Sequence, residues 1–319
     1  MNDQDKQILA LLKDFLPEKI FDVHAHLCNV EMQTDFAGFT REYGTTGAKR
    51  FQEDQKRLLG ERAVAGLMIP MPVPSMWKNR DAVNRWVVEQ AASMPGFAAE
   101  VYVLPTDTVA DIEAMLTHPC IKGFKCYYMT AAGDAGDQSE IADFLPESAW
   151  QVANQRGMCI TLHMMKTLSP ADPVNQEYIL TMTRKYPGAK LILAHCGRGF
   201  ATWTILETAR KFKGIDNIYY DLAAICDSAA MFEVIRQAGA DHVMWGSDYP
   251  LSQNFWRPYT MGTNFQWLNP DRYPGLGIGC LETESLLAFY HASLMLELSR
   301  QDVEDIFWNN AVRLLGLDV

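Results

Sequence analysis

Short apolar segments recur along the chain, and longer amphipathic stretches separate most of them. β-Branched, aromatic and other apolar residues fill the short segments, which is typical of strands buried in a parallel sheet. Eight strands are predicted, at 20–27, 64–70, 98–104, 121–128, 158–164, 189–196, 217–223 and 242–248. Apolar residues at helical spacing predict helices between them, at 79–93, 107–117, 146–156, 173–186, 200–213 and 228–239. This alternation of strand and helix predicts a parallel sheet.

Eight strand–helix units in one chain favour a closed (β/α)8 barrel of the TIM type. An open Rossmann sheet is the alternative, but no GxGxxG follows an early strand to support it. The sequence shows no linker, no low-complexity run and no repeat beyond the alternation itself. We therefore predict an α/β protein with a single barrel domain over residues 1–319.

Additional segments extend this barrel. The first residues place Ile8, Leu12 and Leu16 at helical spacing, which predicts an amphipathic N-terminal helix, and 283–299 and 301–315 read as two helices at the other end. Long insertions follow the first strand, at 28–60, and the eighth, at 251–282. Because loops after barrel strands surround the catalytic mouth, both insertions are expected there as walls or lids.

The net charge and the cysteine content of the chain limit which partners and which cellular compartment are expected. The formal net charge of −11 and the pI near 5.1 argue against nucleic acid or an anionic membrane surface as a partner. The seven cysteines are dispersed without a CxxC pair, which favours a reducing compartment, so we expect a cytoplasmic protein. The N-terminus does not resemble a signal peptide, and no apolar run is long enough to span a bilayer. A small-molecule substrate is the expected partner, and the question whether the chain forms a homo-oligomer stays open.

Histidines mark one end of the predicted barrel. His24 and His26 lie on the same face of the first strand, at its C-terminal end, where barrel active sites form. His163 and His195 close the fifth and sixth strands at the same rim. Two ordinary buried histidines are the alternative for the HxH pair, but imidazoles are costly to bury without partners and are common zinc ligands.

Two further polar residues reach this rim. Asp248 follows the eighth strand; it is either a turn residue or the carboxylate that completes an N3O ligand set, which suits zinc and, less specifically, iron or manganese. Lys125 ends the fourth strand, and it either extends to solvent or has a role in the site. The other three histidines, His118, His242 and His291, are placed elsewhere and are expected to be structural.

Taken together, these motifs resemble the amidohydrolase superfamily, in particular its amidohydrolase 2 branch of hydrolases and non-oxidative decarboxylases. The matching pieces span nearly the whole chain in the family's order. They are DVHAH at 22–26, GFK at 123–125, TLH at 161–163, LAHCG at 193–197, WGSDYP at 245–250 and NNAVRLLGL at 309–317.

This resemblance implies one divalent metal, with Zn²⁺ expected first and Mn²⁺ or Fe²⁺ as alternatives. Its implied ligands are His24, His26, His163 and Asp248, while His195 would contact the metal-activated water or the substrate. Lys125 matches a lysine that is carboxylated and bridges two metals in binuclear relatives, so a second metal stays open.

The implied reaction is hydrolysis of a small amide, lactone or similar carbonyl compound, with Asp248 as proton acceptor and donor, assisted by His195 and Lys125. Arg198 is either a ligand for a substrate carboxylate or a surface ion pair. Decarboxylation at the same metal site is the main alternative. A barrel that binds a ligand without catalysis is the third, and metal content would distinguish it.

Overall fold

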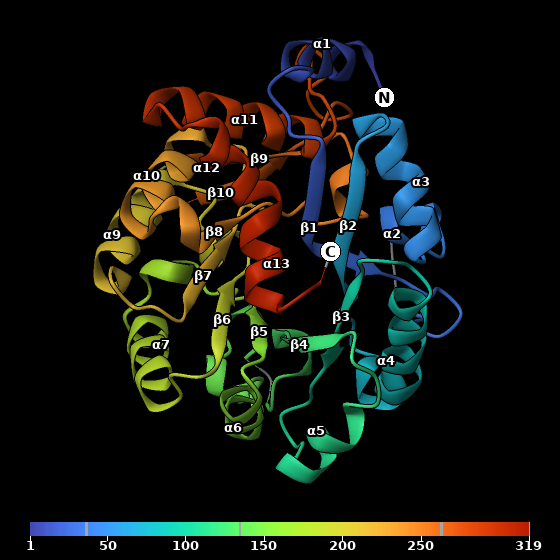
Figure 1. Cartoon of the computed structure of the whole chain (residues 1–319), viewed down its shortest axis with the longest axis vertical. Helices are drawn as coiled ribbons and strands as arrows, with labels where there is room; N and C mark the ends of the chain where they lie inside the picture. Colours follow the sequence, from blue (N-terminus) through green and yellow to red (C-terminus); the bar gives the residue numbers. More distant parts are fainter. Residues whose placement is uncertain (36–37, 134, 262–263, 319) are drawn as a thin grey trace.

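The computed structural model describes residues 1–35, 38–133, 135–261 and 264–318. Its main sheet has eight parallel strands that follow one another in sequence order, as the blue-to-orange progression in Figure 1 shows. The strands are β1 (Lys19–Leu27), β2 (Ala63–Pro70), β3 (Ala98–Tyr102), β4 (Ile121–Cys126), β5 (Cys159–Leu162), β6 (Lys190–Leu193), β7 (Ile218–Asp221) and β8 (Val243–Met244). All eight strand predictions are confirmed.

Backbone hydrogen bonds between β1 and the segment that begins with β8 close the sheet into a barrel. The amide of Val23 donates to the carbonyl of Trp245 at 3.1 Å, and the amide of His26 donates to that of Tyr249 at 2.7 Å. Between them the amide of Asp248 donates to the carbonyl of His24 at 2.9 Å. The backbone that closes the barrel therefore brings Asp248 beside the HxH motif.

Helices surround the sheet, and local sequence signals set their ends. Asp172 caps one of them through the amides of Val174 and Asn175, with Pro173 at its first position, and another ends at Gly157, which is left-handed at φ 64°. The helices between the strands are α4 (Met76–Ala92), α5 (Val109–Met115), α6 (Glu147–Arg156), α7 (Pro173–Lys185), α8 (His195–Arg198), α9 (Thr202–Phe212) and α10 (Ser228–Ala238). Six of these match predicted helices to within a few residues, and α8 is a short additional turn.

The first insertion is only partly a loop. It contains α2 (Phe39–Tyr43) and the longer α3 (Ala48–Leu59), which packs against β2 as one of the helices around the barrel. The expectation that all of 28–60 forms a wall or lid is thus wrong for its second half. Charged and polar residues dominate α3, so its sequence as a whole is hydrophilic, although Ala48, Phe51 and Leu59 are buried on one face.

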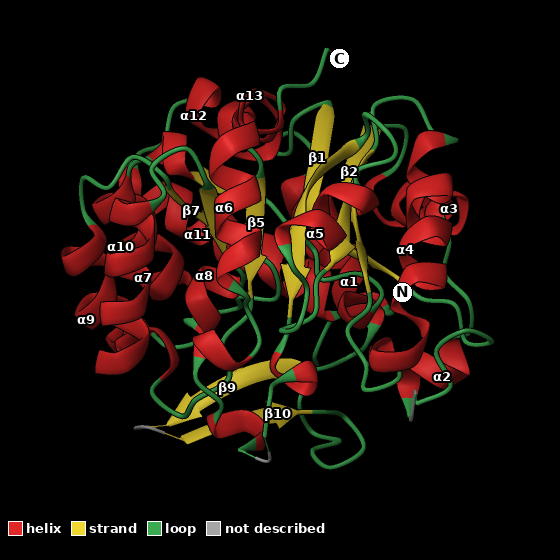
Figure 2. Ribbon diagram, turned by 90° about the horizontal axis from the view of Figure 1, so that it is seen from below, coloured by secondary structure: helices red, strands yellow, loops and turns green. Residues whose placement is uncertain are grey.

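The second insertion lies at the mouth, as expected. Its strands β9 (Arg257–Met261) and β10 (Asn264–Leu268) form an antiparallel hairpin. Figure 2 shows this hairpin below the barrel, on the side toward which the arrowhead of β5 points. The hairpin therefore covers the end where the strands deliver their C-terminal residues.

The two ends of the chain form the remaining helices. The N-terminal helix α1 (Asp3–Leu12) packs against α11 (Leu281–Leu296), next to it in Figure 1. Buried Asp5 joins them, because its Oδ1 accepts from the amide of Cys280 and from the hydroxyl of Thr283, both at 2.7 Å. The last predicted helix is continuous, but it contains a π-helical stretch, Asp305–Asn309, between α12 (Arg300–Glu304) and α13 (Asn310–Leu315).

None of the described helices is both long and apolar enough to cross a membrane. All seven cysteines are free thiols, and six of them are buried. The reducing, cytoplasmic compartment stays a prediction.

Candidate metal centre

The HxH motif lies on β1, and the carboxylate of Asp22 holds it against the segment after β8. Asp22 Oδ1 accepts from the amides of His24 and Ser247, both at 2.9 Å, and its Oδ2 accepts from Ser247 Oγ at 2.5 Å. Gly246 lets the two segments approach, since a Cβ atom at that residue would lie 2.9 Å from His24 Cβ. Asp248 itself is left-handed, at φ 67°, which is uncommon for a residue with a side chain.

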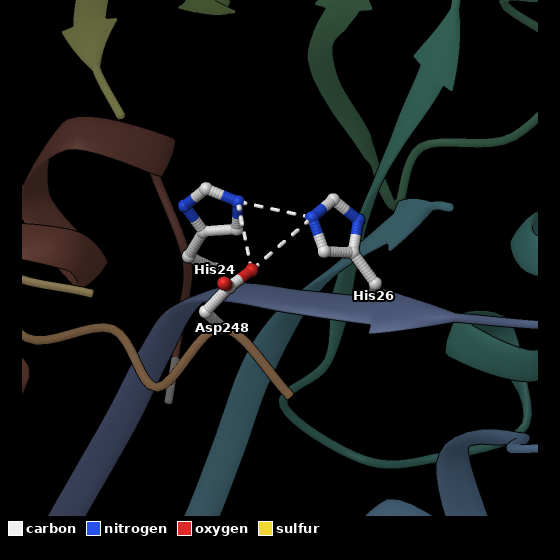
Figure 3. Close-up of side chains that lie close together, drawn as sticks. All are labelled: His24, His26 and Asp248. Atoms are coloured by element: carbon white, nitrogen blue, oxygen red, sulfur yellow. Dashed lines mark hydrogen bonds and ion pairs between the residues drawn. The ribbon is translucent and has the colours of Figure 1, made fainter. Parts of the chain in front are cut away.

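Three donor atoms converge at this point (Figure 3). His24 Nε2 lies 3.1 Å from His26 Nε2, and Asp248 Oδ1 lies 3.8 Å from the first and 3.5 Å from the second. All three side chains are buried. In the part of the chain that the structure describes, they form one of two groups of histidine and acidic residues that could hold a metal ion.

The donors suit zinc in both spacing and chemistry. Ligands about 2.0 to 2.2 Å from a tetrahedral zinc lie roughly 3.3 to 3.6 Å from one another, close to the separations seen here. Burial lowers the pKa of His24 and of His26 well below the usual value, so both imidazoles are neutral and each has a lone pair to donate. Burial also raises the pKa of Asp248 well above its usual value, and this cost of a buried negative charge is one that a cation would offset.

Asp221, which the sequence analysis missed, orients this group. It ends β7, and its Oδ2 accepts from His24 Nδ1 at 2.9 Å, which leaves Nε2 of that ring as the lone pair facing His26. Its Oδ1 accepts from the amides of His195 at 2.7 Å and Ala223 at 3.1 Å. Asp221 also belongs to the second candidate group, with His24 and His195, but both of its oxygens already accept hydrogen bonds. The sequence feature that could have revealed Asp221 is an acidic residue at the end of an apolar strand, the same feature that marked Asp248.

His195 follows β6 in an unusual backbone turn. The four residues from His195 to Arg198 all have positive φ, at 53°, 54°, 74° and 64°, and only Gly197 among them is a glycine. Such strain is concentrated at functional sites. The ring of His195 stacks on that of His24, with centroids 4.7 Å apart, and its Nδ1 lies 2.8 Å from the carbonyl oxygen of Ala223. Because a carbonyl only accepts, Nδ1 carries the proton, and in the neutral ring Nε2 is an acceptor.

His163 lies at the same site but in neither candidate group. Its ring meets that of His195 edge to face, with centroids 5.0 Å apart, and stands 4.6 Å from the ring of Tyr127. His163, His26, His195 and Asp248 line a cavity of about 270 Å³ whose other walls are mainly apolar and come from the loops after β1, β2, β4 and β8. His163, the fourth predicted ligand, therefore lines the same cavity as His26 and Asp248.

Comparison with known protein families gives a match. The family profile described as amidohydrolase, for the amidohydrolase 2 family, matches residues 21–317. The chain belongs to the amidohydrolase 2 family. No curated protein matches the sequence.

Solved structures with the same fold include three that are similar over almost their whole length. A 2,6-dihydroxybenzoate decarboxylase from Rhizobium is 13% identical, with a TM-score of 0.63 over 95% of this chain and 100% of its own. An amidohydrolase from Burkholderia multivorans with bound zinc is 12% identical, with a TM-score of 0.63 over 93% of this chain and 99% of its own. A probable 2-pyrone-4,6-dicarboxylic acid hydrolase from Acinetobacter baumannii is 13% identical, with a TM-score of 0.60 over 93% and 99%.

Within this amidohydrolase 2 barrel, Lys125 is fully buried instead of extending to solvent. Its Nζ has no hydrogen-bond partner among the described residues, and burial lowers its pKa. The charges that act on it most strongly are those of Glu100 and Asp221. The buried placement favours a role in the site over the solvent alternative, and the role itself stays a prediction.

Glu100, on β3, is a second buried acid that sequence reasoning missed. It reaches past β4 to β5, where its Oε1 accepts from Thr161 Oγ1 at 2.7 Å. Burial raises its pKa to about 8. An acid in the middle of an apolar strand could have revealed it.

Arg198 is half-buried in the turn after His195, and its Nη1 donates to the carbonyl of Met165 at 3.0 Å. It is not among the described residues that line the cavity, so its binding of a substrate carboxylate stays a prediction. The three histidines expected to be structural lie apart from the metal group. His118 and His291 are exposed, and His242 Nδ1 lies 2.8 Å from the carbonyl oxygen of Ile218.

Proposed function

We propose that the chain is a metal-dependent hydrolase of a small amide, lactone or similar carbonyl compound. The convergence of His24 Nε2, His26 Nε2 and Asp248 Oδ1 supports this proposal most directly. In the proposal these three side chains hold one divalent cation, zinc first, and His163 supplies the fourth ligand from the cavity wall. The zinc bound in the Burkholderia relative agrees with that choice.

A divalent cation held there supplies Lewis-acid activation of water. Asp248 is the proposed proton acceptor for the attacking water and the donor to the leaving group, because its carboxylate lies beside both histidines. His195 presents Nε2 as an acceptor, so it is suited to hold and orient the attacking water. The cavity volume of about 270 Å³ limits the substrate to a small molecule, and the apolar walls suit an apolar part of that molecule.

Non-oxidative decarboxylation is the second candidate, because the same donor set serves it and a 2,6-dihydroxybenzoate decarboxylase shares the fold. The two reactions differ in the fate of water. Zinc-loaded protein is incubated in H₂¹⁸O with lactones, 2-pyrone-4,6-dicarboxylate and 2,6-dihydroxybenzoate. Incorporation of ¹⁸O into an opened product supports the hydrolase, while CO₂ release with no ¹⁸O in the organic product identifies the lyase and refutes the hydrolase.

The metal assignment is tested separately by equilibrium dialysis against zinc, with metal analysis of the protein. His24→Ala and His26→Ala are expected to lose the metal while the barrel stays folded, since these residues lie at the rim. His291→Ala on the exposed face of α11 is the matched control and keeps the metal. Full zinc occupancy in either rim variant, or a wild-type chain that binds neither zinc nor manganese, would overturn the assignment; the second result favours a barrel that binds without catalysis.

A further inference from the structure

Phe200 lies directly behind His195. The two rings stack with centroids 5.6 Å apart and an angle of 28° between their planes. His195 also stacks on His24, with the planes at 30°. The imidazole of His195 therefore stacks on a proposed metal ligand and also on an aromatic ring that the proposed reaction does not use.

Phe200 in turn contacts the β9–β10 hairpin. Its ring meets that of Trp267 on β10 edge to face, with centroids 6.0 Å apart. From β9, Thr260 Oγ1 donates to the carbonyl of Phe200 at 3.5 Å, a long hydrogen bond. A continuous row of rings thus runs from the hairpin to the metal group, in the order Trp267, Phe200, His195, His24.

This support matters because the backbone beneath His195 is strained. Left-handed backbone is strained for residues other than glycine, so the turn persists only where its surroundings hold it. The amide of His195 and its Nδ1 are fixed by hydrogen bonds, but one face of the ring depends on Phe200. An aromatic stack typically stabilises a ring by more than the apolar area that it buries.

From these contacts we propose that Phe200 is a positioning residue for His195, and that the β9–β10 hairpin holds Phe200 in place through Trp267. The hairpin then affects the metal centre through packing alone, without contributing a ligand. The proposal about ring position is independent of the reaction, and only its effect on turnover rests on the proposed function.

The first measurement follows the ring itself. In protein labelled with ¹³C-histidine, the Cε1–Hε1 signal of His195 is assigned by its loss in His195→Asn. Phe200→Leu keeps an apolar side chain but removes the ring current, so this signal moves downfield, and Trp267→Leu is expected to move it in part. Phe200→Tyr retains the stacked ring, so the His195 signal is expected to keep its wild-type chemical shift. Tyr273→Leu, which alters an exposed aromatic residue of the same insertion, leaves it unchanged.

A matched control exists outside the site. Tyr219 stacks on His242 with centroids 4.9 Å apart and planes at 12°. Tyr219→Leu removes the same kind of stack from a histidine that the proposed reaction does not use. It is expected to move the His242 signal and to leave both the His195 signal and turnover as in the wild type.

The second measurement separates positioning from a general structural role. With zinc-loaded protein and p-nitrophenyl acetate as probe, Phe200→Leu should lower kcat by about 10- to 10²-fold with KM and zinc content unchanged, as expected for a displaced reacting group. If kcat falls while the His195 signal stays in place, or if the signal moves while kcat is unchanged, the proposal is overturned. Loss of zinc in Phe200→Leu overturns it as well. If the wild type does not hydrolyse the probe, the proposed function loses support, and the His195 signal in Trp267→Leu, which retains the Phe200 ring, still decides the positioning.

Discussion

Replacing Asp221 by Asn tests whether Asp221 orients the ring of His24, a proposed metal ligand. The amide oxygen of Asn can still accept from the amides of His195 and Ala223, which lie 2.7 and 3.1 Å from Asp221 Oδ1. Its NH₂ group, however, would face the protonated Nδ1 of His24, so two donors meet at the 2.9 Å contact. His24 relieves the conflict by moving its proton to Nε2, and that nitrogen then has no lone pair for a metal.

The expected loss is in metal affinity. Removal of a hydrogen-bond partner behind a metal-binding histidine typically weakens binding by about 10- to 100-fold, or roughly 1.4 to 2.7 kcal/mol. Zinc affinity is measured by competition with a chromogenic chelator, and thermal unfolding checks that the barrel stays intact. Asp227→Asn is the matched control, because Asp227 also accepts backbone hydrogen bonds after β7 but caps α10 instead. Zinc binding by Asp221→Asn within twofold of the wild type would refute the role of Asp221 in orienting His24.

Three further outcomes are expected. Asp248→Asn lowers metal affinity modestly but turnover by about 10²-fold or more, because it removes the proton acceptor; near-normal kcat with metal bound would exclude Asp248 as the proton carrier. Lys125→Ala lowers turnover while metal analysis stays at one zinc per chain; a fall from two to one would instead establish a carboxylated lysine bridge. Glu282, fully buried in α11, has a pKa raised by burial from 4.5 to about 8, so its stabilising protonated form is lost as pH rises through that window. Glu282→Gln should therefore raise the unfolding temperature relative to the wild type at pH 8 and not at pH 4.5. An equal difference at both pH values would contradict the raised pKa of the Glu282 carboxyl.

The barrel and its rim histidines could be predicted because both follow from periodic patterns. Apolar strands delimit their own ends, and the C-terminal ends of parallel barrel strands share one rim. A histidine that closes a strand, such as His163, is thereby placed in space by its position in sequence alone. Helix α3 was not predicted because its buried face lacks a regular apolar pattern. Its buried face includes Asp54 and Gln55, polar residues that partners from distant segments compensate, so the face does not read as apolar.

The residues that orient the rim were harder to predict because they act through contacts between distant segments. Asp221 is 197 residues from His24 in sequence, and its carboxylate satisfies that ring and the amide of His195 together. The turn at His195 places three non-glycine residues at positive φ, which local propensity opposes, so it needs tertiary contacts to stabilise it. One of those contacts is the Asp221 carboxylate and another is the ring of Phe200. A change at either residue should thus affect the metal centre without removing any of its ligands, which is why we expect those variants to keep the fold and alter the chemistry.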